Sequence, residues 1–201
     1  MAGQFWSTSK LDPKRSYRFL LELSPFEKWV VKKVNRPGWE ISETEHKYIN
    51  HTFYYPGRVT WKEVSCTIVD PVNVDSTAIL QKWLMASGYR LPLSVDATRT
   101  ITKAEATQSL GSPVIHIIGG GDKDSMEAPE ATILETWTLQ NAWIKDCTLG
   151  DLDYEADDLV NIDLTLRYDY AKVDFPNRRQ DALLSNNQHV NTVSDAMLIG
   201  S

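Results

Sequence analysis

The stretch from residue 159 to residue 170 constrains the fold more than any other part of the chain. It reads Leu-Val-Asn-Ile-Asp-Leu-Thr-Leu-Arg-Tyr-Asp-Tyr, so that apolar or aromatic side chains alternate with polar ones. A period of two predicts a long β-strand with one apolar face and one polar face. Such a polar face is typical of two structures, the surface of a β-sandwich and the wall of a water-filled space, and the pattern alone fits both.

The composition argues against two broad classes of protein. Of the 201 residues, 42% are hydrophobic and 24% are charged, as in ordinary globular domains. No apolar run approaches the roughly 20 residues of a membrane-spanning helix, and the N-terminus lacks the apolar core of a signal peptide. The formal net charge of −6 argues against tight binding of nucleic acid, which needs clustered Lys and Arg. We therefore expect the chain to be made in a cytoplasm-like compartment.

Hydrophobic periodicity and turn residues predict a mainly β fold with one α-helix, in which the sheets are those of a sandwich or the wall of a water-filled space. The helix is expected at about residues 75–87, where Asp75 can cap its start and Gly88 can end it. A weaker helix or turn is expected at 101–110. Strands are expected at 17–23 and 28–34, paired as a hairpin, and at 58–70, 113–118, 131–145 and 159–170.

The sequence divides into three regions. Residues 1–16 are polar and read as an N-terminal arm, and residues 17–171 form the β domain. Residues 172–201 are enriched in Asn and Gln and lack periodicity, which predicts an extension that is disordered or contacts neighbouring subunits.

No motif indicates catalysis. The chain lacks a Gly-x-Ser-x-Gly elbow, and neither cysteine has a nearby histidine that would make it a nucleophile. His46 and His51 are five apart in a segment read as extended, so we expect them on opposite faces, which disfavours a metal site. Cys66 reads as a core residue and Cys147 as part of a turn, without a disulfide between them. We expect no enzyme, no catalytic residue, no cofactor and no metal.

The seven tryptophans leave a second function open. Those at positions 61, 83, 137 and 143 lie in apolar patterns, which favours the core or an interface over a sugar-binding groove. A monomeric β-sandwich module that binds carbohydrate through exposed tryptophans is the alternative.

Several short phrases, in a fixed order, resemble the tail tube proteins of contractile-tailed (myovirus-type) bacteriophages. They include Tyr55-Pro56-Gly57-Arg58-Val59-Thr60-Trp61 and Leu164-Thr165-Leu166-Arg167-Tyr168-Asp169-Tyr170-Ala171. The others lie at 17–23, 31–37, 45–50, 67–71, 83–84, 88–89, 137–142 and 153–154. None is a chemical signature, so the resemblance over residues 17–171 rests on their number and order.

The resemblance implies a structural role. It implies a β-barrel-like or sandwich-like fold with one flanking α-helix, and hexameric rings whose inner strands join into one shared β-barrel. The rings stack into a hollow tube inside a contractile sheath. Such a tube penetrates the host envelope and conducts DNA, and related folds occur in type VI secretion and in contractile injection systems. The implied partners are further copies of the chain, the sheath protein, baseplate and tail-terminator proteins, and DNA that passes without specific binding. The implied location is the phage tail, assembled in the host cytoplasm, without membrane insertion of the subunit.

Two sets of residues follow as hypotheses. The polar face of the opening stretch, with Asn161, Asp163, Thr165, Arg167 and Asp169, is expected to line the lumen. The segment from Glu43 to Tyr55 is too long and polar for a tight turn, so we expect it to project and dock on the adjacent ring, and we expect its aromatic anchors to be Tyr48, Phe53 and Tyr54. A surface loop on a monomer is the alternative for that segment. The sequence leaves open whether the chain is a repeating tube subunit or a baseplate protein that starts the tube.

Overall fold

The computed structural model describes residues 13–73, 75–93, 99–119, 133–155 and 157–176. Contacts within the chain divide it into two compact units. The larger unit comprises Leu20–Ile115 and Trp137–Lys172, and the smaller comprises Met1–Phe19, His116–Thr136 and Val173–Ser201. Most of the predicted arm and of the predicted extension falls outside the described residues, so the boundaries at 16 and 172 stay predictions.

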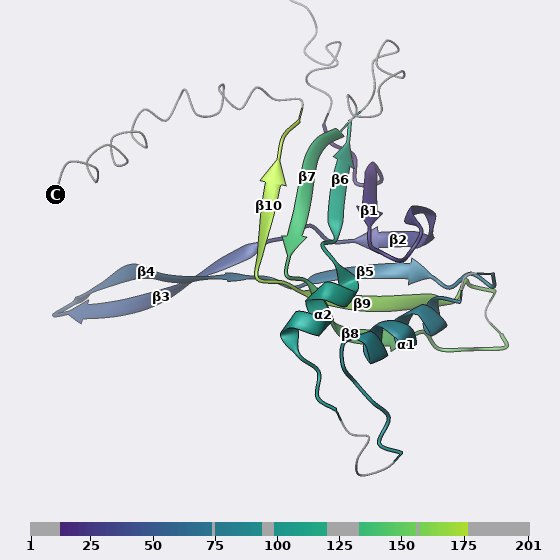
Figure 1. Cartoon of the computed structure of the whole chain (residues 1–201). Helices are drawn as coiled ribbons and strands as arrows, with labels where there is room; N and C mark the ends of the chain where they lie inside the picture. Colours follow the sequence, from purple (N-terminus) through teal and green to yellow (C-terminus); the bar gives the residue numbers. More distant parts are fainter. Residues whose placement is uncertain (1–12, 74, 94–98, 120–132, 156, 177–201) are drawn as a thin grey trace, which may run out of the picture. The chain divides into compact units, whose positions relative to one another are not determined.

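The larger unit contains a four-stranded antiparallel sheet in the order β2–β5–β9–β8. Its strands are β2 (Val31–Val34), β5 (Val64–Val69), β9 (Asn161–Arg167) and β8 (Trp143–Leu149). β5 and β9 pair over their whole registered length, from Val64 opposite Leu166 to Val69 opposite Asn161. Figure 1 shows this sheet with the two helices of the same unit beside it.

One face of this sheet forms the hydrophobic core. Burial alternates along β5 and β9, so that Val64, Ile68, Leu164 and Leu166 are completely covered. Burying a large apolar side chain contributes roughly 1.5–3 kcal/mol, so these two strands supply much of the driving force for folding. Cys66 lies in the same core, as predicted.

A second four-stranded sheet has the order β1–β6–β7–β10. Its strands are β1 (Phe19–Glu22), β6 (Val114–Ile118), β7 (Ile133–Gln140) and β10 (Tyr170–Asp174). The predicted hairpin of residues 17–23 and 28–34 is wrong, because β1 and β2 belong to different sheets. Between them, the Leu23–Phe26 bridge and the short 3-10 helix η3 (Lys28–Val30) redirect the chain.

The stretch that alternates from 159 to 170 is two strands rather than one. β9 ends at Arg167 and β10 begins at Tyr170, and the chain passes from one sheet to the other between them. The predicted strand at 131–145 is likewise broken, because Asn141 adopts φ 54° in the turn between β7 and β8. Asparagine tolerates this left-handed conformation better than most residues.

Two helices occur where the sequence predicted one helix and one helix or turn. α1 (Ser76–Ala86) begins as predicted, with Asp75 accepting a hydrogen bond from the Ala78 amide at 2.9 Å. α2 (Lys103–Leu110) begins after Thr102, whose hydroxyl accepts from the Glu105 amide at 3.3 Å. The prediction of a mainly β fold is confirmed, and α2 adds a second helix to the one expected.

The predicted extended segment is a hairpin of β3 (Trp39–Tyr48) and β4 (His51–Trp61). Tyr48 pairs with His51, so the chain turns at Ile49 and Asn50. The sequence did not predict this turn, because Ile-Asn is not one of the Gly-containing pairs that are typical of two-residue hairpins. All ten residues of β3 are exposed, and Figure 1 shows the hairpin extending beyond the sheet of its own unit.

Candidate functional site

Four of the five residues predicted to line a lumen share one face of β9. Asn161, Asp163, Thr165 and Arg167 alternate with the buried core residues of the strand. Asp163 is exposed, and the other three are half-buried. The structure therefore brings these four side chains together on the face of the sheet opposite the core.

Neighbouring strands continue this surface in register. Lys32 Nζ donates to Asn161 Oδ1 at 3.4 Å, and the Thr67 hydroxyl donates to the Asp163 carboxylate. We call the surface the polar sheet face. Besides the four β9 residues and Lys32, its residues are Lys33 on β2, Ser65 and Thr67 on β5, and Asp146 and Thr148 on β8.

Positive and negative charges are interspersed at one end of the polar sheet face. Lys145 Nζ lies 2.6 Å from Glu63 Oε1, and Arg167 Nη1 lies 3.5 Å from the same oxygen. Exposed ion pairs contribute only about 0–1 kcal/mol to stability. Their effect is on the surface field, because Lys145 and Arg167 both lie near the Glu63 carboxylate.

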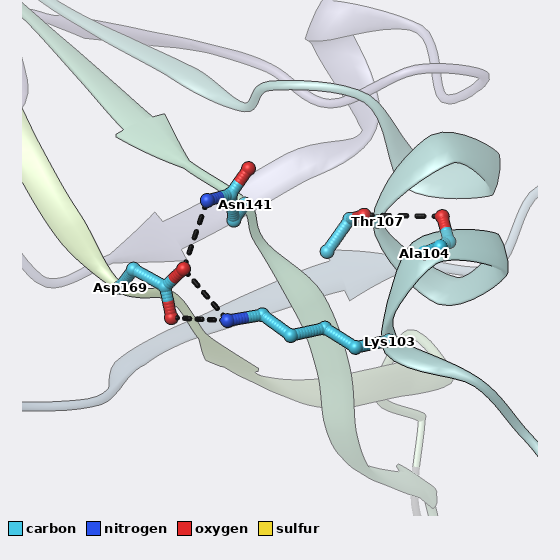
Figure 2. Close-up of polar contacts among 5 residues, drawn as sticks. All are labelled: Lys103, Ala104, Thr107, Asn141 and Asp169. Carbon is cyan, nitrogen blue, oxygen red and sulfur yellow. Dashed lines mark hydrogen bonds and ion pairs between the residues drawn. The ribbon is translucent and has the colours of Figure 1, made fainter.

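Asp169, the fifth predicted lumen residue, lies beyond β9 in a cluster of its own (Figure 2). Lys103 Nζ lies 2.7 Å from both carboxylate oxygens, and Asn141 Nδ2 donates to Oδ2 at 2.8 Å. The hydrogen bonds from Lys103 and then Asn141 lower the pKa of the Asp169 carboxyl, because they stabilise its charged form. The Asp169 amide also donates to the Gln140 carbonyl at 3.0 Å. Asp169 thus ties the start of α2 to the turn between β7 and β8.

A pocket of about 550 Å³ lies beside this cluster, among the end of β4, the start of α2 and the end of β9. We call it the root pocket, because three of its residues form the base of the β3–β4 hairpin. Its lining residues are Val59, Thr60, Trp61, Ile101, Thr102, Lys103, Ala106, Trp143, Arg167, Tyr168 and Asp169. The sequence did not predict this pocket, because its walls come from segments far apart in the chain.

The three predicted stacking residues lie near the tip of the β3–β4 hairpin, and all are exposed. The register places Tyr48 opposite His51 and His46 opposite Phe53, so these four side chains share one face. Tyr54 lies on the other face. The rings of His51 and Phe53 meet edge to face at 4.6 Å.

The predicted separation of His46 and His51 onto opposite faces is wrong, because the turn at residues 49 and 50 reverses the chain between them. Within the described residues, no group of three His, Cys, Asp or Glu side chains is arranged to hold a metal ion.

Both cysteines have free thiols. Burial and the charge of Asp163 raise the pKa of Cys66 to about 12. Cys147 lies exposed on strand β8 rather than in the predicted turn, and partial burial followed by the charge of Asp146 raises its pKa. Since the thiolate is the nucleophilic form, neither environment activates its sulfur.

The tryptophans divide between core and surface. Trp61, Trp83 and Trp137 pack against the hydrophobic core, as their apolar patterns predicted. Trp29 and Trp39 are more than half exposed. Among the described helices, none is long and apolar enough to cross a membrane.

Solved structures of contractile particles contain chains with a similar fold. A chain of the six-fold symmetrised anti-feeding prophage baseplate aligns with a TM-score of 0.56 and 14% identity, over 83% of this chain and 99% of that one. A chain of the sheath/tube terminator of an extracellular contractile injection system, PVC, aligns with a TM-score of 0.56 and 17% identity, over 81% and 97%. A chain of the PVC sheath-tube complex aligns with a TM-score of 0.54 and 14% identity, over 87% and 99%.

At these identities the likeness concerns the fold alone. It confirms the predicted fold relationship to tail tube proteins. No protein-family model matches the chain, and no curated protein does.

We predict that Asp169→Asn lowers the free energy of unfolding at neutral pH and has little effect in acid. The folded-state pKa of Asp169 is depressed, so its bonds to Lys103 and Asn141 stabilise the fold above its unfolded pKa of about 3.9 and are lost as pH falls through the folded value. Urea unfolding of the unchanged chain and of the Asp169→Asn variant, from neutral pH down to strong acid, measures the difference in their free energies of unfolding. A difference that stays constant in strong acid would contradict this assignment.

Proposed function

We propose that the chain is a structural, non-enzymatic subunit of a tail tube, which forms hexameric rings that stack into a hollow tube inside a contractile sheath. The observation that carries the proposal is the polar sheet face, which spans all four strands of a sheet whose other face is the core. A sheet of this kind serves as a wall between protein and water. The shared fold with chains of contractile particles supports the same role.

The ends of this sheet provide the means to close a ring. β2 and β8 are its outer strands, and the last five residues of β8 are exposed. Outer strands present backbone N–H and C=O groups that pair readily with another chain. Closing the sheets of neighbouring subunits into one barrel satisfies those groups and places the polar sheet face on its inner wall.

In this proposal the lumen is lined by Asn161, Asp163, Thr165 and Arg167, and Asp169 lies at its margin. DNA binding gains most of its free energy when Lys and Arg release counterions from phosphate. Here Arg167 and Lys145 already lie near Glu63, and Asp163 accepts a hydrogen bond from Thr67. The basic residues of the face are thus interspersed with acidic ones, so the wall offers phosphate no uniformly basic surface, which suits passage of DNA without specific binding.

The remaining parts of the chain are assigned to contacts with neighbours. The tip of the β3–β4 hairpin, through Tyr48, Phe53 and Tyr54, docks on the adjacent ring. The N-terminal arm (1–16) and the C-terminal extension (172–201) flank the tube domain (17–171), and most of both lies outside the described residues. The sheath, baseplate and tail-terminator proteins are the other partners, and the assembled tube in the virion crosses the host envelope without membrane insertion of the single subunit.

Electron microscopy of the purified full chain tests this proposal. We expect rings or tubes with a central bore, and no saturable quenching of tryptophan fluorescence by oligosaccharides. The alternative, a monomeric carbohydrate-binding module, would draw on the exposed Trp29 and Trp39. A chain that stays monomeric while sugars quench its fluorescence would replace the tube by that alternative.

We predict that deletion of residues 46–53 abolishes stacking and leaves rings intact. The deletion removes the exposed hairpin tip but leaves the core strands β2, β5, β8 and β9 unchanged. Sedimentation and particle length in micrographs measure stacking. Deletion of Asp151–Asp153, in the exposed loop after β8, is the matched control. Stacks of normal length in the 46–53 deletion would refute the docking role of the hairpin.

A further inference from the structure

We propose that the root pocket of one copy receives the hairpin tip of a second copy, so that tip and pocket form one repeated head-to-tail contact along the tube. This inference rests on the proposed function and names the receptor that the docking hairpin occupies. It commits to a second copy of this chain as the occupant.

The root pocket has the size and chemistry to take aromatic side chains. Its volume of about 550 Å³ lies in the range of sites that enclose small ligands, roughly 300–1,000 Å³. Val59, Trp61 and Ile101 supply apolar walls. Val59 is 57% exposed and Ile101 is 50% exposed, so both can contact an incoming side chain. At the start of α2, Lys103 and Asp169 form an ion pair at the edge of the pocket, and the Thr102 hydroxyl is hydrogen-bonded to Glu105. Apolar walls with a few polar groups suit tyrosine, which presents an apolar ring and a hydroxyl.

The hairpin tip has the complementary chemistry on one of its two faces. Tyr48 and Phe53 stand there with His46 and His51, which makes a continuous aromatic surface at the tip. The opposite face near the tip carries the Lys47–Glu45 ion pair beside Tyr54. Aromatic side chains dominate the energetics of protein interfaces, so the face with Phe53 is the one we assign to the pocket.

The turn places a large apolar side chain at the end of the hairpin. Ile49 is 84% exposed, and its φ of 50° is the positive value that the first residue of a two-residue hairpin turn requires. Its side chain is therefore available to enter an apolar pocket.

Because the tip and the pocket lie at opposite ends of the hairpin, each copy can contact one neighbour through its tip and another through its pocket. Val59, Thr60 and Trp61 end the same strand that begins at the tip with His51. Tip and pocket are thus separated by the length of the hairpin, on the order of 30 Å for ten residues at about 3.3 Å each. The two strands approach closely where their register shifts: Ser42 Oγ accepts from the Arg58 amide at 2.9 Å, and a Cβ on Gly57 would lie 2.4 Å from that oxygen. A head-to-tail contact between different surfaces generates an open array rather than a closed dimer.

Cysteine cross-linking tests the contact. The double variant Phe53→Cys with Ile101→Cys, on a Cys147→Ser background, places one thiol at the tip and one in the pocket. Cys66 stays in place because it is buried and its pKa is about 12. Under mild oxidation we expect a ladder of dimers, trimers and longer multimers on a non-reducing denaturing gel. Micrographs of the same sample should show an axial repeat on the order of 30 Å.

The matched control is Phe53→Cys with Thr148→Cys on the same background, because Thr148 is exposed on the polar sheet face. We expect this pair to give at least ten-fold less cross-linked product. Tubes without a 53–101 ladder, or with equal ladders from both pairs, overturn the pocket assignment and leave the proposed function standing. A chain that forms neither tubes nor ladders overturns both.

Discussion

Because Leu164, Leu166 and their neighbours on β5 bury their side chains in one core, the alternate positions of both strands must face the other way. This geometric constraint creates the polar sheet face. A shift of one residue in register would exchange every buried leucine for a charged or polar side chain, so burial fixes the register. The core therefore also fixes which side chains form the polar sheet face and where they stand along the strands.

The rest of the larger unit presents surfaces that a monomer leaves unsatisfied. The outer strands β2 and β8 end the sheet without a further strand of the same sheet among the described residues. The β3–β4 hairpin holds exposed aromatic rings such as Phe53 at one end and the root pocket at the other. In the proposed tube, lateral pairing closes the sheet and axial docking fills the pocket, so one fold supplies both directions of assembly.

Sequence reasoning reached the mainly β fold, the capped helix α1 and the two-faced character of β9, because each depends on a local pattern. It did not predict the break at Asp169. The alternation of polar and apolar residues continues through this position, although the chain passes there from one sheet to the other. It also missed the turn at Ile49, which lacks the usual glycine. The cluster of Lys103, Asn141 and Asp169 and the root pocket depend on tertiary proximity between distant segments, and no spacing in the sequence reports them.

If the polar sheet face lines a shared, water-filled bore, a cryo-EM reconstruction of the assembled full chain will show it. We expect Asp163 and Thr165 to face the bore, Leu164 to lie inside its own subunit, and β8 of one copy to pair with the sheet of the next. A map in which Asp163 and Thr165 face the outside of the tube, or pack against another protein, would refute the assignment of this face to the bore.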